Sequence, residues 1–351
     1  MEYRQLGRSG LRVSQLTLGT MGFGGSGQFT PVGQIDVEGA RRQLDMALDA
    51  GVNTVDTADM YSAGAAEEIV GKVLSGRRER VVLATKARFS MGPGPNDAGL
   101  SRQHLIEACE ASLRRLQTDH IDLYQVHEWD GQTALEETLG ALDHLLASGK
   151  VRYVGCSNFG GWQVMKALGI ARQTGLPAFV SQQVYLSLHE RSAEYEIVPS
   201  AIDQGLGLLI WSPLAGGLLS GKFRRGQPPP PGSRHAGEWT EPPVYDEEKL
   251  FDTIDELVAI ADQMGVSAAR VALAWLLARP GVSSVIVGSR TEEQLADCLA
   301  AATLELAPDQ HARLEAVSRP PLIYPFWHQA ASATDRLSAA DLSLIGPHLQ
   351  S

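Results

Sequence analysis

Short apolar runs alternate along the chain with segments in which apolar residues recur every three or four positions. Runs such as residues 52–55 and 81–84 fit buried strands, because they are short and rich in valine. The segments between them fit amphipathic helices, whose apolar side chains lie on one face. This alternation is typical of β-α-β units, in which helices cover parallel strands.

The pattern predicts one closed barrel preceded by a hairpin. Residues 3–6 and 11–16 flank Gly7-Arg-Ser-Gly10 and predict a β-hairpin, which we expect to plug the barrel floor. The eight strands that follow are predicted to end at Gly19, Asp56, Lys86, His127, Cys156, Val184, Trp211 and Val287. The predicted helices span residues 36–49, 65–74, 101–116, 133–147, 162–173, 194–204, 246–263, 267–278 and 291–301. Eight strands suit a (β/α)8 TIM barrel, although a doubly wound sheet accommodates the same alternation.

Two regions interrupt this regular pattern. Residues 212–245 are rich in glycine and proline and predict a long loop. Residues 319–351 lie beyond the last barrel unit and include the aromatic segment Tyr324-Pro-Phe-Trp-His328 and a weak helical pattern at 338–344. We therefore expect one α/β domain at 1–318, with two extra helices, and a C-terminal extension at 319–351. That extension, with the Trp239 region, should border the substrate mouth or form a subunit contact.

Composition and charge narrow the class of protein. The apolar fraction of 44% and charged fraction of 20% are ordinary for a globular protein with a large core. A net charge of −11 and a pI near 5.3 argue against a nucleic-acid partner. Three widely spaced cysteines predict neither a disulfide framework nor a metal site. Without a signal peptide or a long apolar segment, we expect a cytoplasmic monomer or homo-oligomer that does not associate with membranes and acts on a small molecule.

Ionisable side chains stand where three successive predicted strands end. Asp56, Lys86 and His127 close the second, third and fourth strands, and Tyr61 follows Asp56 by five residues. Neighbouring strands of a barrel end at the same mouth, so these side chains should converge. Each one alone is equally well explained as a rim residue in a salt bridge or hydrogen bond, but four coincident strand ends favour a site.

The four residue types suit proton transfer to an oxygen. A lysine ammonium held by Asp56 would stabilise the Tyr61 phenolate and lower the pKa of that phenol. Neutral His127 would donate a hydrogen bond to a substrate carbonyl and fix its orientation. Together they describe an acid that protonates an oxygen while a hydride reaches the adjoining carbon.

An anion site is predicted at the loops that follow the last two strands. Residues 214–222 are glycine-rich, so bare backbone N–H groups should approach phosphate oxygens beside Lys222, unless the glycines only make a flexible connection. Gly288-Ser-Arg290 precedes a predicted helix whose N-terminus favours an anion. Phosphate sites of barrel proteins recur at this pair of loops.

A second glycine-rich segment, Gly22-Phe-Gly-Gly-Ser-Gly27, matches the G-x-G-x-x-G pattern of dinucleotide-binding Rossmann folds. In those folds the glycines open a helix whose N-terminus holds the pyrophosphate. Here the next helical pattern begins only near Asp36. We therefore interpret this segment as a loop without that function.

With these residues in view, the sequence resembles the aldo-keto reductases along nearly its whole length. The matching segments are Leu16-Thr-Leu-Gly-Thr-Met21, Asp56-Thr-Ala-Asp-Met-Tyr61, Lys86, His127, Gly155-Cys-Ser-Asn-Phe159, Gln182, Trp211 to Lys222 and Gly288 to Gln294. The resemblance implies NADP(H) as cofactor and a catalytic tetrad of Asp56, Tyr61, Lys86 and His127, with Tyr61 as general acid. The cofactor residues that it implies are Gly19, Thr20, Met21, Asp56, Ser157, Asn158, Gln182, Trp211, Ser212, Leu214, Gly216, Leu218, Lys222, Gly288, Ser289, Arg290, Gln294 and Asp297.

The resemblance also assigns parts of the cofactor. Ser157, Asn158 and Gln182 would hold the nicotinamide carboxamide, which needs both donors and acceptors, although the first two could instead cap the next helix. Trp211 would stack on the nicotinamide ring instead of packing in the core, at a position where tyrosine is commoner in the family. Ser289 and Arg290 would meet the 2′-phosphate and residues 214–222 the pyrophosphate. Gln294 and Asp297 would lie near the adenine, with Asp297 replacing the usual asparagine.

Three functions follow as hypotheses. The first is NADPH-dependent reduction of an aldehyde or ketone to the alcohol, with the reverse oxidation of an alcohol left open. The second is a redox-sensing NADPH-binding module like the potassium-channel beta subunits that share this fold. The third is a barrel lyase that forms a Schiff base at Lys86.

Overall fold

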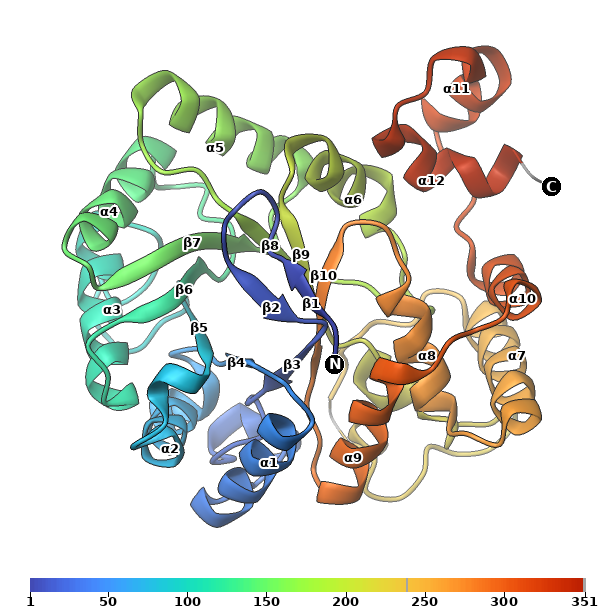
Figure 1. Cartoon of the computed structure of the whole chain (residues 1–351), viewed down its shortest axis with the longest axis horizontal. Coiled ribbons are helices and arrows are strands. Elements are labelled where there is room, and N and C mark those ends of the chain that lie inside the picture. The colour runs from blue at the N-terminus through green and yellow to red at the C-terminus, as the bar shows by residue number, and fades with distance from the viewer. Residues whose placement is uncertain (238, 350–351) are drawn as a thin grey trace.

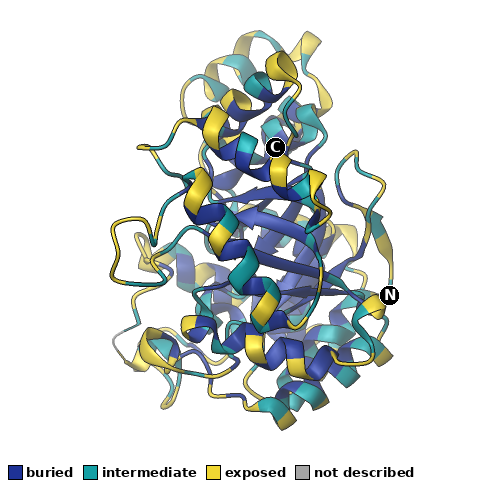
Figure 2. Cartoon of the chain, turned by 90° about the vertical axis from the view of Figure 1, so that its left-hand side faces the viewer, coloured by how far each residue is buried: buried dark blue, intermediate teal, exposed yellow. Residues whose placement is uncertain are grey.

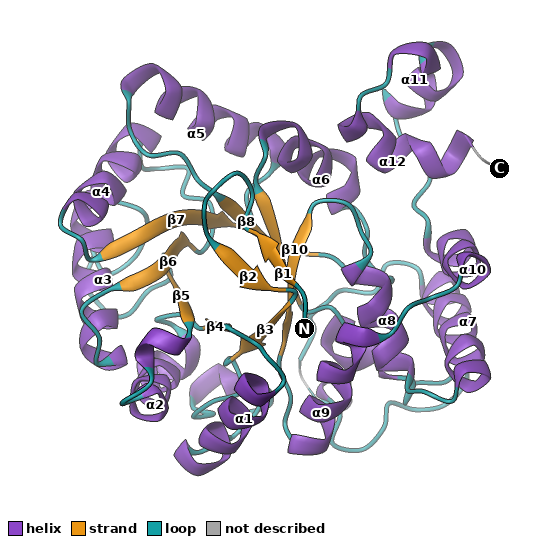
Figure 3. Ribbon diagram, viewed as in Figure 1, coloured by secondary structure: helices purple, strands orange, loops and turns teal. Residues whose placement is uncertain are grey.

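The computed structural model describes residues 1–237 and 239–349. Within them, parallel strands close into a barrel in the order β10-β3-β4-β5-β6-β7-β8-β9 (Figures 1 and 3). The strands are β3 (Leu16–Gly19), β4 (Thr54–Asp56), β5 (Val82–Ala87), β6 (Ile121–Val126), β7 (Val151–Ser157), β8 (Ser181–Tyr185), β9 (Gly207–Trp211) and β10 (Val282–Val287). The (β/α)8 prediction is confirmed. The doubly wound alternative is wrong, because β10 pairs with both β9 and β3 and leaves no sheet edge.

Helices surround the barrel and bury its outer face (Figure 1). The ring consists of α1 (Val37–Asp49), α2 (Ala65–Leu74), α3 (Arg102–Leu116), α4 (Leu135–Ala147), α5 (Gly161–Thr174), α6 (Ala193–Gln204), α8 (Ala268–Leu277) and α9 (Glu292–Ala300). Several begin where the sequence offers a capping side chain: Asp36, Ser101, Ser267 and Thr291 each accept a hydrogen bond from the N–H three residues later.

Two further helices lie outside the repeat, α7 (Glu247–Met264) and α10 (Pro308–Ser318), and they pack against each other. The first was predicted as 246–263. The second was missed, because only Leu314 and Ser318 of α10 are buried and the segment therefore lacks an apolar stripe.

The N-terminal hairpin closes the barrel floor, as predicted. β1 (Tyr3–Gln5) pairs with β2 (Arg12–Ser14), and both lie across the barrel in Figure 1. Leu6 and Val13 are almost fully buried against side chains from the barrel interior, including Leu123 and Leu209. The hairpin therefore seals the end opposite the strand termini and leaves one mouth for ligands.

The barrel strands are buried on both faces, as Figure 2 shows by their dark colour inside a partly exposed helical layer. All residues of β4 and β10 are buried. Both faces of a parallel sheet are covered in this architecture, which explains why the strands read as continuous apolar runs rather than alternating ones. The polar residues at the carboxyl ends of the strands are therefore exceptions to this apolar pattern, and each needs a hydrogen-bond or ionic partner.

The C-terminal extension folds into α11 (Phe326–Ser332) and α12 (Ala339–Leu349) and packs on α6. The ring of Tyr195 stacks on Phe326 at 5.9 Å, and its hydroxyl donates to Pro321 O at 2.5 Å. Only the second of these helices was indicated by the sequence. Figure 1 shows the extension at the periphery, beyond α6, and a role at the substrate mouth stays a prediction.

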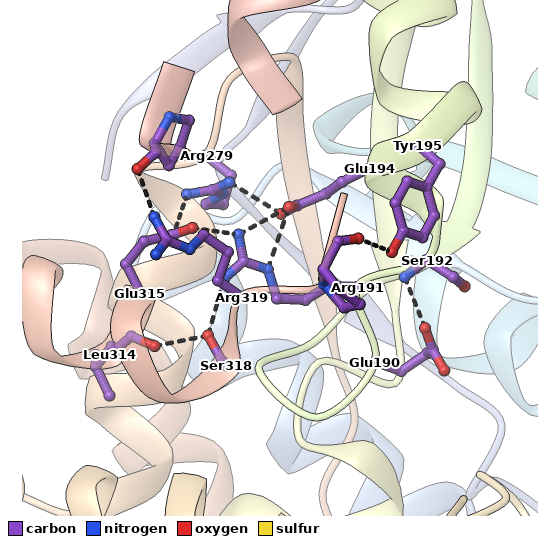
Figure 4. A network of polar contacts seen from close by, with 12 residues as sticks. Glu190, Arg191, Ser192, Glu194, Tyr195, Arg279, Leu314, Glu315, Ser318 and Arg319 are labelled. Atoms are coloured by element: carbon purple, nitrogen blue, oxygen red, sulfur yellow. Dashed lines mark hydrogen bonds and ion pairs between the residues drawn. The ribbon is translucent and has the colours of Figure 1, made fainter. Parts of the chain in front are cut away.

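A buried ionic network ties this side of the molecule together (Figure 4). Arg191 Nη2 contacts Glu194 Oε2 at 2.7 Å and Glu315 Oε1 at 2.8 Å. Arg279 contacts the other oxygens of both carboxylates at 2.9 and 3.2 Å, and both guanidinium groups lie about 5 Å from the Trp275 ring. Since removing one partner of a buried ion pair costs about 3–5 kcal/mol, the network fixes α6, α8 and α10 relative to one another.

No single helix of the described chain has both the length and the apolar character that a membrane span requires. The helices α7 and α8 meet these requirements only together, across a bend of 100°.

Candidate active site

The four predicted catalytic residues converge at the barrel mouth. Lys86 Nζ lies 2.6 Å from Asp56 Oδ2 and 3.3 Å from Tyr61 Oη, and the Tyr61 and His127 rings are 5.9 Å apart. Lys86 and Asp56 are almost completely buried, and Tyr61 is half-buried. The prediction that neighbouring strand ends bring these side chains together is confirmed.

Lys86 is held as an ammonium by three oxygens. Besides Asp56 and Tyr61, it donates to the backbone oxygen of Thr57 at 2.8 Å. Burial is the largest single influence and lowers the pKa of Lys86, but Asp56 and Tyr61 together outweigh it and leave the pKa above its ordinary value. Asp56 Oδ1 in turn accepts from the amide of Gln183 at 2.8 Å. The pair is therefore charged and fixed in orientation.

The effect of Lys86 on Tyr61 differs from the prediction. Lys86 does lower the pKa of the phenol, but burial raises that pKa more, so the net direction is upward. The expectation of a net lowering is wrong for the protein alone, since few polar groups other than Lys86 offset the desolvation. The phenol keeps its proton at neutral pH, which is the state that an acid needs before it reacts.

His127 is neutral, which is the state that its proposed hydrogen bond to a carbonyl requires. Burial lowers the pKa of His127 well below its ordinary value, and the positive fields of Lys86 and Arg88 act in the same direction. The ring packs edge-on against Phe89, with centroids 4.9 Å apart. Its Nδ1 atom is buried and has no hydrogen-bond partner among the residues that the structure describes. A neutral imidazole can donate one hydrogen bond to a carbonyl oxygen without competing for the proton.

A strained turn holds Tyr61 in place. Ser62 and Ala63 have positive φ angles of 50° and 53°, which cost free energy for residues with a Cβ atom. Ser62 offsets this cost through its hydroxyl, which donates to Phe23 O at 2.9 Å and accepts from Gly25 N at 3.0 Å. The Gly22–Gly27 segment thus braces the turn after Tyr61, and it leads only into a single 3-10 turn at Gly27–Phe29 rather than the long α-helix that a dinucleotide-binding fold requires. The rejection of the Rossmann interpretation is confirmed.

Sequence reasoning missed a buried acid behind the phenol. Asp59 is fully buried, and neither of its carboxyl oxygens has a hydrogen-bond partner among the described residues. Burial, followed by the nearby Glu67 carboxylate, raises the pKa of Asp59 to about 8. This carboxyl is therefore protonated at neutral pH and adds little negative charge beside Tyr61. Its position inside the Asp56-Thr-Ala-Asp-Met-Tyr61 motif was the available signal.

The residues predicted to hold a carboxamide lie beside His127. Asn158 Nδ2 donates to His127 O at 3.2 Å, and its Oδ1 accepts from the Trp211 indole at 3.0 Å. Ser157 Oγ donates to Gln183 O, and Gln182 Nε2 donates to Phe159 O at 2.5 Å. The capping alternative is wrong, because α5 is capped at Gly160. Gln182 Oε1 is buried without a partner among the described residues, so an acceptor remains for a ligand amide.

Trp211 is half-buried rather than part of the core, as predicted. One face of the indole stacks on Tyr185, with centroids 4.9 Å apart and planes inclined by 29°. A cavity of about 230 Å³ lies next to it, lined in part by Asn158, Phe159 and Tyr185. The indole, the Asn158 amide and this cavity therefore adjoin one another, although none of the four tetrad residues lines the cavity.

The glycine-rich loop after β9 is more ordered than predicted. Ser212 and Ala215 have positive φ angles, as do Gly216 and Gly217. Gly216 N donates to Ser212 Oγ at 3.1 Å, and Gly217 N donates to Leu214 O at 2.9 Å. The expectation of bare N–H groups is therefore wrong at these two glycines, because the tight turns satisfy them internally. Leu218 is buried and Lys222 is exposed.

Two arginines meet at the loop after β10. Arg290 donates to Gly232 O at 2.7 Å, and its N–H donates to Gln294 Oε1 at 3.0 Å. Arg234, which the sequence did not single out, is close enough that burial and the positive field of Arg290 lower its pKa. Neither guanidinium has a carboxylate partner among the residues described, and Ser289 Oγ is buried without a hydrogen-bond partner. Two guanidinium groups without carboxylate partners, beside a buried hydroxyl, are suited to bind an anion.

The remaining predicted cofactor residues are placed as follows. Thr20 donates to Asp56 O through both its N–H and its hydroxyl, each at 3.0 Å, and so fixes the Gly19-Thr20-Met21 segment over β4. A Cβ atom at Gly288 would lie 3.5 Å from Gly19 O, which brings the loop after β10 to the same rim. Asp297 instead pairs with Arg270 at 2.6 Å and contacts Ser267, so it joins α9 to α8. Its predicted role near the adenine stays a prediction.

Comparison with known proteins agrees with this arrangement. The fold and the polar cluster at its strand ends define a TIM-barrel protein with a candidate active site at one mouth. The model of the aldo/keto reductase family matches residues 15–319, and the chain belongs to that family. It is 43% identical over 317 residues to the uncharacterized oxidoreductase YrpG of Bacillus subtilis (strain 168), covering 87% of this chain and 92% of that protein.

Two other relatives carry more specific names. The chain is 39% identical over 326 residues to a probable voltage-gated potassium channel subunit beta of Oryza sativa subsp. japonica, covering 90% and 96% of the two proteins. It is 36% identical over 348 residues to the versiconal hemiacetal acetate reductase of Aspergillus parasiticus, covering 93% and 99%. One name describes a channel subunit and the other a reductase, so these two names support different functions.

Proposed function

We propose that the protein reduces an aldehyde or ketone to the alcohol with NADPH, reversibly, and that Tyr61 is the general acid. The observation that carries the proposal is the contact between Lys86 Nζ and Tyr61 Oη, made by an ammonium that Asp56 holds in a buried pair. NADPH, when bound, would supply the hydride for the carbonyl carbon. The balance is one carbonyl, one NADPH and one proton converted into one alcohol and one NADP⁺.

The residues of the chain manage the proton and the oxygen. The Tyr61 hydroxyl donates its proton to the carbonyl oxygen as that oxygen becomes an alkoxide. The Lys86 ammonium then stabilises the phenolate, and Asp56 keeps the ammonium in place. Neutral His127 donates a second hydrogen bond to the same oxygen and orients it. Afterwards Tyr61 regains a proton from solvent. Proton transfer of this kind contributes about 10²–10⁴-fold in rate.

The residues present also fit the proposed cofactor. Gln182 Oε1, a buried acceptor without a described partner, suits the N–H₂ of a carboxamide, and Trp211 offers an aromatic face. Ser289 Oγ, Arg290 and Arg234 together offer donors and positive charge to a phosphate monoester. The protein as a whole is acidic and provides little other attraction for a phosphate monoester. This local positive cluster therefore favours NADPH, which carries a 2′-phosphate, over NADH, which does not.

Arg290→Ala is expected to weaken NADPH binding about ten- to hundredfold and to leave NADH binding almost unchanged. The reason is that charge-assisted hydrogen bonds contribute about 1.5–3 kcal/mol and NADH has no 2′-phosphate. Fluorescence titrations of both cofactors at two salt concentrations measure this, and the NADPH advantage should shrink with salt. Arg80→Ala is the control, since Arg80 is exposed on another surface loop. Equal losses for NADPH and NADH would show that Arg290 supports only the loop.

Turnover separates the reductase from the two other hypotheses. The protein is expected to consume many equivalents of NADPH when given a panel of aldehydes and ketones, whereas a sensor would stop near one equivalent. Absorbance at the nicotinamide band measures this directly. A Schiff-base lyase is disfavoured because Lys86 is charged, fully buried and bonded to three oxygens. Borohydride trapping of a substrate on Lys86 without cofactor would reverse that judgement.

A further inference from the structure

A second cation stands near the catalytic histidine, and the proposed mechanism does not use it. Arg88 follows Lys86 by two residues at the carboxyl end of β5. The strand β5 ends at Ala87, so Arg88 is the first residue beyond the strand and lies at the rim of the mouth, where the carboxyl ends of the strands meet. The backbone is fixed on both sides: Ala87 O accepts from His127 N at 3.1 Å, and Arg88 O accepts from Gly99 N at 2.8 Å.

The guanidinium of Arg88 lies near His127, the residue assigned to orient the carbonyl oxygen. Its Cζ atom is 5.4 Å from the centre of the Phe89 ring, and that ring packs on His127 at 4.9 Å. Its positive field also lowers the pKa of His127. Two independent features, a ring contact and an electrostatic effect, therefore place Arg88 next to the oxygen-orienting histidine.

Arg88 has no anionic partner in the described chain. Its Nε atom is buried without a hydrogen bond, and the side chain forms no ion pair with any described residue. Three other half-buried arginines differ from it, because Arg78, Arg115 and Arg270 each have a carboxylate oxygen within 2.7 Å. A contact with the face of Phe89 does not satisfy N–H donors. An unpaired buried donor is costly, which favours a partner that arrives with the substrate.

The nearby carboxyl group of Glu128 does not fill this role. Glu128 is close enough for Arg88 to lower its pKa, but burial raises that pKa more, and the net direction is upward. Glu128 Oε1 instead accepts from the backbone N–H of Trp129 at 3.0 Å. A single guanidinium next to a partly buried carboxyl can balance one negative charge on a ligand. A carboxylate carries one negative charge, whereas a phosphate monoester carries more than one.

We propose that Arg88 is a specificity-determining residue that binds a carboxylate on the carbonyl substrate, so that the preferred substrates are aldehydes or ketones bearing a carboxylate. This inference rests on the proposed reductase function, because it names the substrate class of the same site. The aromatic ring of Phe89 would cover the carbon skeleton between the reacting carbonyl and the carboxylate. Planar bidentate pairing with the guanidinium would fix the substrate's orientation.

The test compares two aldehydes that differ only in charge, 4-carboxybenzaldehyde and its methyl ester. With the wild-type protein and NADPH, we expect the acid to have the higher kcat/KM, and the difference to decrease as salt rises. Arg88→Met should reduce kcat/KM for the acid about ten- to hundredfold relative to the ester, mainly through KM. Arg88→Lys should recover part of this preference. Arg80→Met, which removes an exposed arginine, should leave the ratio unchanged.

Each alternative result has a separate meaning. If the wild-type protein reduces neither aldehyde nor any other carbonyl, the proposed function fails. If it reduces both and Arg88→Met changes them equally, the function stands and the role of Arg88 is overturned. Glu128→Gln should increase the preference for the acid by removing a competing charge. If it decreases that preference, or if thermal unfolding of the two single variants and their double variant shows strong coupling, Arg88 is a structural partner of Glu128 and the proposal falls.

Discussion

Tyr61→Phe is expected to lower kcat for carbonyl reduction about 10²–10⁴-fold while leaving NADPH affinity nearly unchanged. The substitution removes one hydroxyl, and with it the proton on the oxygen that Lys86 contacts at 3.3 Å. The ring itself should stay in place, because it packs edge-on against Phe29 at 5.6 Å and against His127 at 5.9 Å. Steady-state kinetics and fluorescence titration of NADPH measure the two quantities separately.

The control for this variant is Tyr153→Phe. Tyr153 lies on β7 and packs in the cluster at the barrel floor, so the same hydroxyl is removed away from the mouth. Activity of the control should match that of the wild-type protein. A Tyr61→Phe variant that lost NADPH affinity as much as turnover would show that the hydroxyl is structural and that another group supplies the proton.

Lys86→Met should produce the second large effect, on both stability and activity. The substitution leaves the Asp56 carboxylate buried without its counter-charge, which costs about 3–5 kcal/mol of unfolding free energy. Activity at neutral pH should fall strongly, because the phenolate that forms when Tyr61 gives up its proton loses its stabilising ammonium. Chemical denaturation and steady-state kinetics measure the two losses.

A double variant separates the structural role of Lys86 from its chemical role. Lys86→Met with Asp56→Asn removes both charges, so much of the lost stability should return, while the amide can still accept from Gln183. Activity should stay low, because the phenol still lacks its ammonium. Recovery of activity together with stability would mean that Lys86 serves the fold only, and the acid assigned to Tyr61 would need another explanation.

The positions of the site residues were predictable because of strand geometry. Strand ends in a parallel barrel meet at one mouth, so Asp56, Lys86 and His127 could be placed together from the alternation alone. The distances among them, the role of Gln183 as a donor to Asp56, and the brace that Ser62 makes with Phe23 and Gly25 were not predictable. These contacts join segments separated by many residues, and periodicity carries no information about such pairs.

The protonation states at the site depend on burial, which the sequence does not specify. The proposed role of His127 requires a neutral imidazole, and the structure supplies that state through burial, with Lys86 and Arg88 as further sources of positive field. For Tyr61 the sequence indicated the ammonium but not the extent of burial, and burial wins. Arg234 and Asp59 were overlooked for the same reason. Among the described residues, Asp59 has no hydrogen-bond partner for its carboxyl oxygens and Arg234 has no carboxylate partner. Such absences can be recognised only in the three-dimensional structure.

The sequence by itself determined the barrel, the hairpin at its floor, the family and the four residues at the mouth, because apolar periodicity and motif spacing are local properties of the chain. The tertiary structure alone decided which polar groups are satisfied. The N–H groups of Gly216 and Gly217 are bonded internally, Asp297 is paired with Arg270, and Arg88 remains without an anion among the described residues. Satisfaction of a donor or charge depends on side chains that converge from distant segments, and no local pattern records that convergence.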